Sequence, residues 1–184
     1  MTKMTITEAL AEIKLINSKL EKKRVRVLDN LVRYSHQPDP FAHEAGGSHG
    51  YLNAEVQSIA ALEENIGKIR AAIMSANLLH TAEVMGKTKT IYEWLVWKRD
   101  VANNIKIFFL QVYVKSKERI EYMRKNPHTV GQPSAEVDPE LSKVVPSLNY
   151  VEFSKKHEEV CDILSKLDGV LSLKNATIVV DVNL

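Results

Sequence analysis

Residues that could bind a metal ion are gathered in one short segment of this chain. His36, His43 and His49 lie there, together with Asp39 and Glu44. Imidazole nitrogens and carboxylate oxygens are ligands that zinc takes in proteins. No two of these histidines, however, have the i, i+4 spacing that would place both on one face of a helix. We therefore expect solvated loop histidines, with neither a metal nor a cofactor.

The single cysteine, Cys161, lies in an apolar helical pattern. This position favours a buried thiol over a nucleophile, because a reactive thiolate needs an electropositive, partly exposed environment. The glycine-rich run Gly46–Gly50 is not followed by the Lys-Ser/Thr pair of a phosphate-binding loop, and no serine has a G-x-S-x-G context. The sequence does not exclude a Ser/His/Asp or Cys/His triad assembled from distant residues. We expect no catalytic residues and a protein that is not an enzyme.

A basic cluster in the first helical segment could contact nucleic acid. It consists of Lys19, Lys22, Lys23, Arg24 and Arg26. Lysine and arginine crowded on one helix are the electrostatic footprint expected of a phosphate-binding surface. Acidic residues crowd the last helical segment in turn, and opposite charges on partner helices commonly set their orientation and solubility. We therefore keep nucleic-acid contact as the alternative to an ordinary charged helix surface.

The overall composition is that of a globular protein. Hydrophobic residues make up 45% of the 184 residues and charged residues 26%, which is enough apolar material for a core. The net charge of +2 is nearly balanced and therefore does not indicate a strongly charged partner. The segment Met1–Ala9 lacks the apolar core of a signal peptide, and no apolar run approaches the ~20 residues of a membrane span. We expect a protein made in the cytoplasm, without a membrane partner.

The elements that position these residues are mostly helices. Thr5 and Glu8 have the spacing of a capping box. The apolar stripe that follows consists of Ile6, Ala9, Ile13, Ile16 and Leu20. It predicts a helix to about Tyr34. Glycine and proline then predict a loop over His36–Gly50, and an apolar heptad repeat predicts a second helix over Leu52–Ala76.

The second half of the chain predicts strands as well as helices. Short strands are expected at Thr81–Val84 and Lys87–Lys89, on either side of a glycine turn. Thr90 and Glu93 form a second capping box, which predicts a third helix to about Lys125. The remaining expected elements are a proline-rich linker at Asn126–Pro146 with one helical turn at Glu140–Val144, a last helix at Leu148–Lys174 and a strand at Thr177–Val182.

The two halves repeat one order of elements: capping box, long helix, loop, long helix, asparagine, short strand. Thr5-Ile6-Thr7-Glu8-Ala9-Leu10 reads like Thr90-Ile91-Tyr92-Glu93-Trp94-Leu95. Asn77 and Asn175 close the second helix of each half, and asparagine tolerates the left-handed conformation that ends a helix. The sequence therefore indicates an internal repeat, with one unit at 1–89 and the other at 90–184.

The predicted fold class is mainly α. Two repeated long antiparallel helical hairpins would pack as a four-helix, coiled-coil-like body, because one hairpin cannot bury both of its apolar stripes. The short strands that follow helices 2 and 4 would form a small β-sheet. A proline-rich loop at 126–147 would interrupt the second unit.

The chain resembles the septicolysin-like family of small helical proteins over most of its length. The shared features are the Glu8-Ala9-Leu10 helix start, Asn77 before a threonine-containing strand, and a helix start of the form T-x-x-E-x-L-x-x-[KR]-[RD]-D. The last matches Thr90, Glu93, Leu95, Lys98, Arg99 and Asp100, with Trp94 and Trp97 as departures, and Asn175-Ala176-Thr177 closes the chain. The chain also looks like small structural proteins of phage virions. The resemblance implies no catalytic residues, and we see no pore-forming segment.

Aromatic residues and the terminal strand are the candidate interface. A helix that is apolar on more than one side must bury more than one side, and aromatic residues are enriched in subunit contacts. The candidates are Trp94, Trp97, Phe109, Ile178 and Val180. The terminal strand must pair either with Thr81–Val84 or with the sheet edge of a neighbour.

These observations favour a structural protein that acts as a homo-oligomer. The expected place of action is a phage virion (capsid, neck or tail), assembled in the host cytoplasm together with other virion proteins. One alternative is an accessory protein that binds or packages nucleic acid through the basic cluster. The other is a toxin or an enzyme whose site is assembled from residues distant in the sequence.

Overall fold

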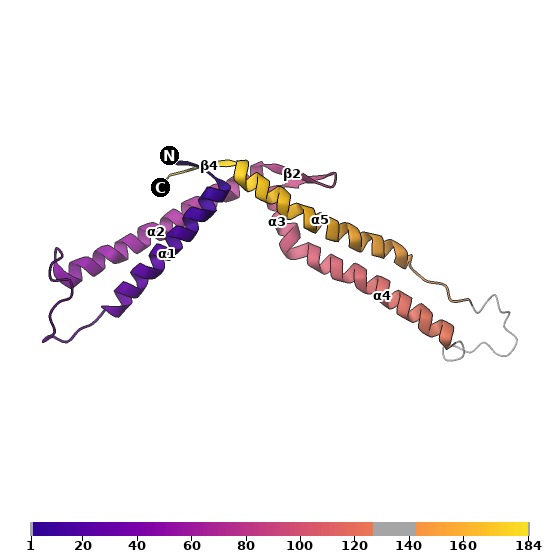
Figure 1. Cartoon of the computed structure of the whole chain (residues 1–184), viewed down its shortest axis with the longest axis horizontal. Coiled ribbons are helices and arrows are strands. Elements are labelled where there is room, and N and C mark those ends of the chain that lie inside the picture. Colours follow the sequence, from indigo (N-terminus) through magenta and orange to yellow (C-terminus); the bar gives the residue numbers. More distant parts are fainter. Residues whose placement is uncertain (1, 127–142, 184) are drawn as a thin grey trace. The chain divides into compact units, whose positions relative to one another are not determined.

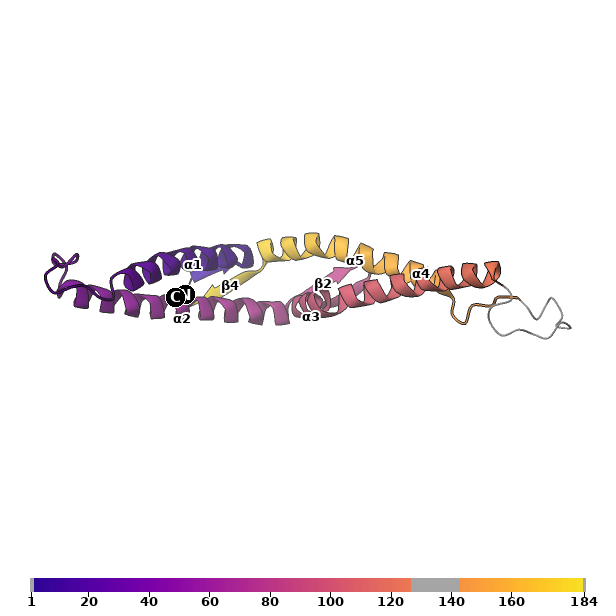
Figure 2. The ribbon, with the colours of Figure 1, turned by 90° about the horizontal axis from the view of Figure 1, so that it is seen from below.

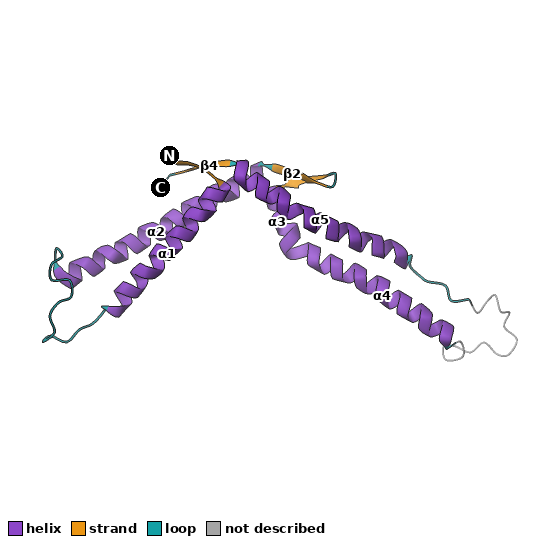
Figure 3. Cartoon of the chain, viewed as in Figure 1, coloured by secondary structure: helices purple, strands orange, loops and turns teal. Residues whose placement is uncertain are grey.

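The computed structural model describes residues 2–126 and 143–183, and in them the chain is mainly helical, with small two-stranded sheets (Figure 1). The helical elements are α1 (Ile6–Asp29), α2 (Gly47–Leu79), α3 (Ile91–Val96), the π-helical segment η1 (Trp97–Ala102), α4 (Asn103–Lys125) and α5 (Tyr150–Thr177). The strands are β1 (Thr2–Thr5), β2 (Thr81–Val84), β3 (Lys87–Thr90) and β4 (Val179–Val182). Because α3, η1 and α4 follow one another without a break, the described residues form four long helices (Figure 3).

These elements group into two compact units. Unit 1 comprises Met1–Thr81 and Leu171–Leu184, and unit 2 comprises Ala82–Val170. The sequence predicted units at 1–89 and 90–184. In the structure, residues 82–89 belong to unit 2 and residues 171–184 belong to unit 1. The reason is that each strand that follows a helix pairs with a strand that precedes another helix.

Helix α1 of unit 1 begins at the predicted capping box. The amide of Glu8 donates to the Thr5 hydroxyl at 3.2 Å, and the amide of Thr5 donates to the Glu8 carboxylate at 2.7 Å. The predicted stripe is buried, with Ile6, Ala9, Ile13, Ile16 and Leu20 at 0–7% exposure. The helix ends at Asp29, before the predicted end at Tyr34, and so leaves Leu31 and Val32 exposed.

Helix α2 begins earlier than the sequence predicted. Gly47 and Gly50 lie in its first turn, although glycine was expected to keep this stretch in a loop. A Cβ on Gly50 would lie 2.4 Å from the carbonyl oxygen of Ala45, so the loop packs against the helix start too closely for any other residue. Ile69 and Ala76 of the predicted heptad stripe are buried, and the remaining stripe residues are half-buried.

Asn77 does not end α2, contrary to the expectation. The helix continues beyond it, and the amide of His80 still donates to the carbonyl of Ala76 at 2.9 Å. Asn77 is buried and has no positive φ. Its counterpart Asn175 lies inside α5 in the same way. The change to extended backbone at His80, which leads into a strand, is what ends the helix.

The terminal strand β4 pairs within the chain, with β1. The two strands are antiparallel, with Thr2 opposite Val182 and Thr5 opposite Val179, and they lie beside α1 in both views (Figures 1 and 2). The prediction of one sheet formed by the strands after helices 2 and 4 is therefore wrong, because β2 pairs with β3 instead. Strand β1 was missed because its four residues, TKMT, carry no apolar alternation.

Unit 2 begins with the predicted β2–β3 hairpin. Met85 and Gly86 join its strands with φ angles of 51° and 75°. Positive φ at both central residues is typical of a type I′ turn, whose twist suits the flanking strands. Strand β3 leads into the second predicted capping box, in which the amide of Glu93 donates to the Thr90 hydroxyl at 3.1 Å.

The π-helical segment η1 rotates the inward face of the long helix that follows. Trp94 and Ala102 are both buried, and the wider π turn between them shifts every later residue by one position. As a result Phe108 is 56% exposed. Its neighbour Phe109 is half-buried and packs on Phe153, with ring centroids 5.7 Å apart.

Helix α5 runs antiparallel to α4. Phe109 lies opposite Phe153, and Tyr113, one turn later, lies opposite Tyr150, one turn earlier. The inward side of α5 carries Val160, Ile163 and Leu167, at 0–8% exposure. Helix α5 begins at Tyr150 and extends beyond the predicted end, to Thr177. Most of the expected linker, and most of the helical turn predicted within it at Glu140–Val144, lies outside the described residues.

Candidate functional site

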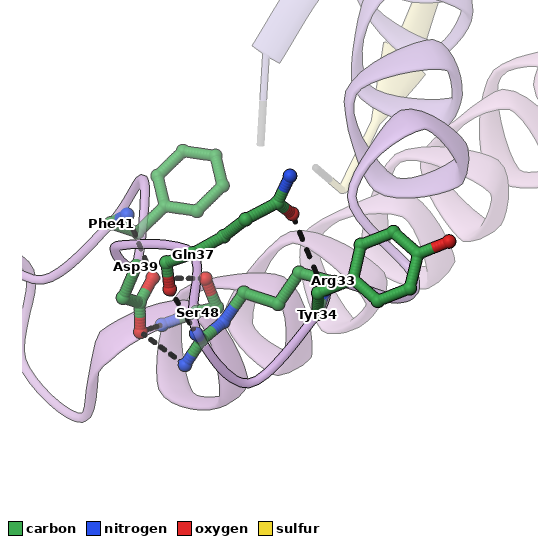
Figure 4. A network of polar contacts seen from close by, with 6 residues as sticks. All are labelled: Arg33, Tyr34, Gln37, Asp39, Phe41 and Ser48. Carbon is green, nitrogen blue, oxygen red and sulfur yellow. Dashed lines mark hydrogen bonds and ion pairs between the residues drawn. The ribbon is translucent and has the colours of Figure 1, made fainter.

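A network of polar contacts joins the loop between α1 and α2 to the first turn of α2 (Figure 4). Asp39 lies at its centre. Its carboxylate accepts hydrogen bonds from the amide of Phe41 at 2.9 Å, the amide of Ser48 at 3.0 Å and the hydroxyl of Ser48. The guanidinium of Arg33 lies 3.9 Å from the same carboxylate and donates to the carbonyl of Gln37 at 2.8 Å.

This network is a cap for α2. The Ser48 hydroxyl and amide, followed by the amide of Phe41, lower the pKa of Asp39 to about 2, so the group is a carboxylate at neutral pH. A negative charge at a helix N-terminus is stabilised by the unpaired amides there. A Cβ on Gly47 would lie 2.8 Å from an Asp39 oxygen, so glycine lets the carboxylate approach. The acceptor atoms of Asp39 are therefore used within the chain.

The loop histidines do not converge with their carboxylate neighbours into a metal site. His36 stacks on Tyr34 with ring centroids 5.5 Å apart, and His43 lies 3.4 Å from a carboxylate oxygen of Glu44. His49 is exposed on the first turn of α2. Within residues 2–126 and 143–183, no three His, Cys, Asp or Glu side chains lie close enough together to hold a metal ion.

Most of the basic cluster on α1 contacts α2. Lys23 binds Glu55 at 3.0 Å, and both side chains are largely buried. Arg24 binds Glu63 at 2.5 Å. Arg26 donates to the Tyr51 hydroxyl at 2.6 Å, and Lys19 and Lys22 are exposed. Three of the five cluster residues therefore hold the hairpin together, and the surface left for a polyanion is smaller than the sequence suggested.

Cys161 has one polar neighbour. Its sulfur lies 3.7 Å from Nε2 of His157, one turn earlier on α5, and both side chains are half-buried. A thiol and an imidazole at this distance form a weak hydrogen bond. The thiol is thus nearer the surface than the apolar pattern around it predicted.

The structure places three of the five candidate interface residues inside their units. Trp94 is 1% exposed, and its indole N–H donates to the carbonyl of Ala82 at 2.9 Å. Ile178 and Val180 are 7% and 4% exposed, facing the core of unit 1. Trp97 is half-buried with its ring edge-on to Trp94, and Phe109 is half-buried against α5. Trp94, Ile178 and Val180 therefore serve the cores and offer no surface to a partner.

The exposed apolar surface of unit 2 lies elsewhere on the same long helix. Ile107, Leu110 and Val114 share one face of α4 and are 38–44% exposed. Their i, i+3, i+7 spacing forms a stripe on the side of the helix opposite Phe109. None of the 23 residues of α4 is fully buried. In the sequence, this exposed apolar surface was indicated by apolar residues on two sides of the helix. We call Ile107, Leu110 and Val114 the α4 outer face.

A groove lies beside the last turns of α4. It has a volume of about 800 Å³, and its apolar lining includes Ile120, Met123, Val144 and Leu148. Lys115 and Arg119 also line it. The groove adds to the apolar surface that unit 2 presents along α4.

Comparisons of the chain with protein-family models, with curated proteins and with solved structures gave no match. Within the described ranges, no helix is long and apolar enough to cross a membrane.

Proposed function

We propose that this chain is a structural protein rather than an enzyme, and that it acts as a homo-oligomer within a larger assembly. The α4 outer face carries this proposal. Its three large apolar side chains are 38–44% exposed, and they share one side of a helix whose other side already packs on α5. An apolar surface of this kind marks a contact site, since its exposure to water is unfavourable.

We propose a phage virion as the place of action, as a component of the capsid, neck or tail. The resemblance to small virion proteins supports this assignment. The proposed architecture is a repeat, in which each half contributes a capping box, two long helices and a strand. Both capping boxes, Thr5 with Glu8 and Thr90 with Glu93, make the same reciprocal hydrogen bonds, which supports a duplicated origin.

The test is the native mass, measured by light scattering after size exclusion. One chain has a mass of 20.8 kDa, so an oligomer of defined size would elute with a multiple of that mass. Leu110→Asp should lower the mass toward one chain without loss of helix signal, because the side chain is 44% exposed and outside the core. A wild-type protein that is a monomer at all concentrations tested would contradict self-association.

Nucleic-acid binding through the basic cluster is the competing proposal. Lys19 and Lys22 are exposed on α1 and remain available to phosphates. Retention of DNA that falls steeply with salt, and that Lys19→Ala with Lys22→Ala abolishes, would favour this alternative. Retention that is unchanged in the double variant would exclude this cluster as the binding surface.

A further inference from the structure

We infer that the α4 outer face docks on the outward side of α2 in a second copy of this chain. This inference rests on the proposed self-association and names its two surfaces. The outward side of α2 carries six exposed small or apolar residues at helical spacing, here called the α2 outer face: Val56, Ala60, Gly67, Ala71, Met74 and Leu78. The two faces belong to different units and are both exposed in one chain.

The α2 outer face has room for a second helix. It is small at Ala60, Gly67 and Ala71, with Glu63 between the first two, and larger toward its ends, where Val56 and Met74 are 50% and 52% exposed. Small residues let a second helix approach closely, and bulky residues on that helix then fill the space between them. The residues of the α4 outer face are all large. From Val56 to Leu78 the α2 face extends for about 33 Å, which is ample for the two turns of the α4 stripe.

Charge favours α2 over a second α4 as the partner. Helix α4 contains six basic and two acidic side chains, a net charge of +4, so two α4 helices would repel each other. Helix α2 contains three acidic and two basic side chains, a net charge of −1. Glu63 and Glu64, beside the centre of the α2 face, are already paired with Arg24 and Lys68 within the chain. The opposite net charges of the two helices therefore favour contact between unlike faces.

The proposed repeat supplies an internal control for the α4 outer face. The two units are aligned by matching Thr5 with Thr90. The π turn in η1 inserts one residue in unit 2, so beyond it buried Ile16 matches buried Ala102. In this alignment Ile107 and Leu110 correspond to two charged residues of α1, Glu21 and Arg24. Val114 corresponds to Leu28, which is itself 65% exposed. The two units therefore differ at two of these three positions.

The α2 outer face differs from its counterpart in the same way. Buried Ile69 corresponds to buried Leu167, which aligns α2 with α5. In this alignment the six residues of the α2 outer face correspond to positions that are mostly polar. These are Ser154, Glu158, Ser165, Gly169, Ser172 and Ala176. The apolar character of the α2 outer face is thus not repeated at the corresponding positions of α5.

A contact between unlike faces is heterologous, so each copy uses α4 toward one neighbour and α2 toward the other. Such a contact closes into a ring if the rotation between copies divides a full turn, and otherwise continues as a filament. The inference therefore predicts rings or filaments. A two-fold dimer formed by like faces is not expected.

The test is cysteine crosslinking in the Cys161→Ser background, which removes the only native thiol. One preparation carries Leu110→Cys and the other carries Ala71→Cys, and the two are mixed, allowed to exchange and oxidised. We expect a disulfide-linked pair only in the mixture. The matched controls are Arg24→Cys and Gly169→Cys, the corresponding positions of the other unit, and their mixture should give at least tenfold less crosslinked product.

Three outcomes separate this inference from the proposed function. Crosslinking between Leu110 and Ala71 in an oligomer supports both. An oligomer in which Leu110→Cys links only to itself, or in which the mixture and the control crosslink equally, overturns the docking surfaces and leaves self-association standing. A protein with the mass of one chain at every concentration, with no crosslink in the mixture, overturns both.

Discussion

The docking of β4 on unit 1 can be tested by three substitutions in one strand. Val180 and Val182 are 4% and 1% exposed, whereas Val179, on the opposite face of the same strand, is 55% exposed. Alanine at each position removes the same two methyl groups and the same preference for extended backbone. The three variants therefore differ only in what each side chain contacts.

The expected cost follows from the buried methyl groups. Two buried carbon groups contribute about 1.6 kcal/mol of transfer free energy, and the space left behind raises the loss to about 2–3 kcal/mol for Val180→Ala or Val182→Ala. For a chain of this size, that loss lowers the midpoint of thermal unfolding by roughly 4–12 °C. Val179→Ala should stay within about 0.5 kcal/mol of the wild type.

The assay is thermal unfolding followed by circular dichroism at 222 nm, with amide hydrogen exchange of residues 2–6 as a local readout. Exchange should accelerate in the Val180 and Val182 variants, because β1 and the Ile6 amide, which donates to the Ile178 carbonyl at 3.0 Å, depend on β4. Equal destabilisation by all three substitutions would refute the reasoning, since it would mean that the buried face of β4 contributes no more to stability than the exposed face.

Three further predictions concern single side chains. Trp94→Phe should cost about 1–3 kcal/mol, because it leaves a buried carbonyl of β2 without its indole donor, whereas Trp97→Phe should cost less; comparing the two by urea unfolding checks this. The pKa of Asp39 lies below its usual value of 3.8, at about 2, so its contribution to stability is complete above pH 4 and is lost as the pH falls toward 2. Asp39→Asn should flatten that part of the stability profile, and a profile identical to wild type between pH 4 and 2 would contradict the capping role. Gly50→Ala should destabilise the chain, because the added Cβ would clash with the carbonyl oxygen of Ala45. Gly169→Ala should stabilise it by up to about 1 kcal/mol, because the Cβ added there has no atom within 4 Å. A Gly50→Ala variant as stable as the wild type would be inconsistent with the tight packing of the loop.

Local signals in the sequence predicted the parts of the fold that local physics determines. The capping boxes at Thr5 and Thr90 were predicted correctly because all their atoms come from four successive residues. The apolar stripe on α1 was also predicted correctly, since every third or fourth residue from Ile6 to Leu20 is apolar and buried.

Long-range pairing and tight packing were the features that the sequence concealed. The partner of β4 is β1, which shows no strand pattern and lies at the other end of the chain. The π turn in η1 has no simple signature, yet it decides that Phe109 faces α5 while Phe108 faces outward. The helical role of Gly50 depends on where Ala45 lies, which only the folded loop determines.

Three of the five candidate interface residues are buried, and the exposed apolar surface of unit 2 lies at other positions of the helix that contains Trp94. An apolar helix must be covered on two sides, and the sequence showed that much for the segment that contains Trp94 and Phe109. Which side faces its own unit depends on η1, so the exposed positions could not be separated from the buried ones before the rotation was known. Trp94 is a core residue, and the exposed surface lies about four to six turns further along, from Ile107 to Val114.

The pairing of β1 with β4 also sets the order in which the two units can be completed. Ribosomes make α1 and α2 first, yet unit 1 cannot close its sheet until Val182 has been synthesised. The β2–β3 hairpin, in contrast, joins neighbouring segments and can form within microseconds of their synthesis. We therefore expect unit 2, which is made later, to acquire its native contacts earlier. Through most of translation β1 remains an open edge, which makes the newly made N-terminal segment the part of this protein that a chaperone would be expected to protect.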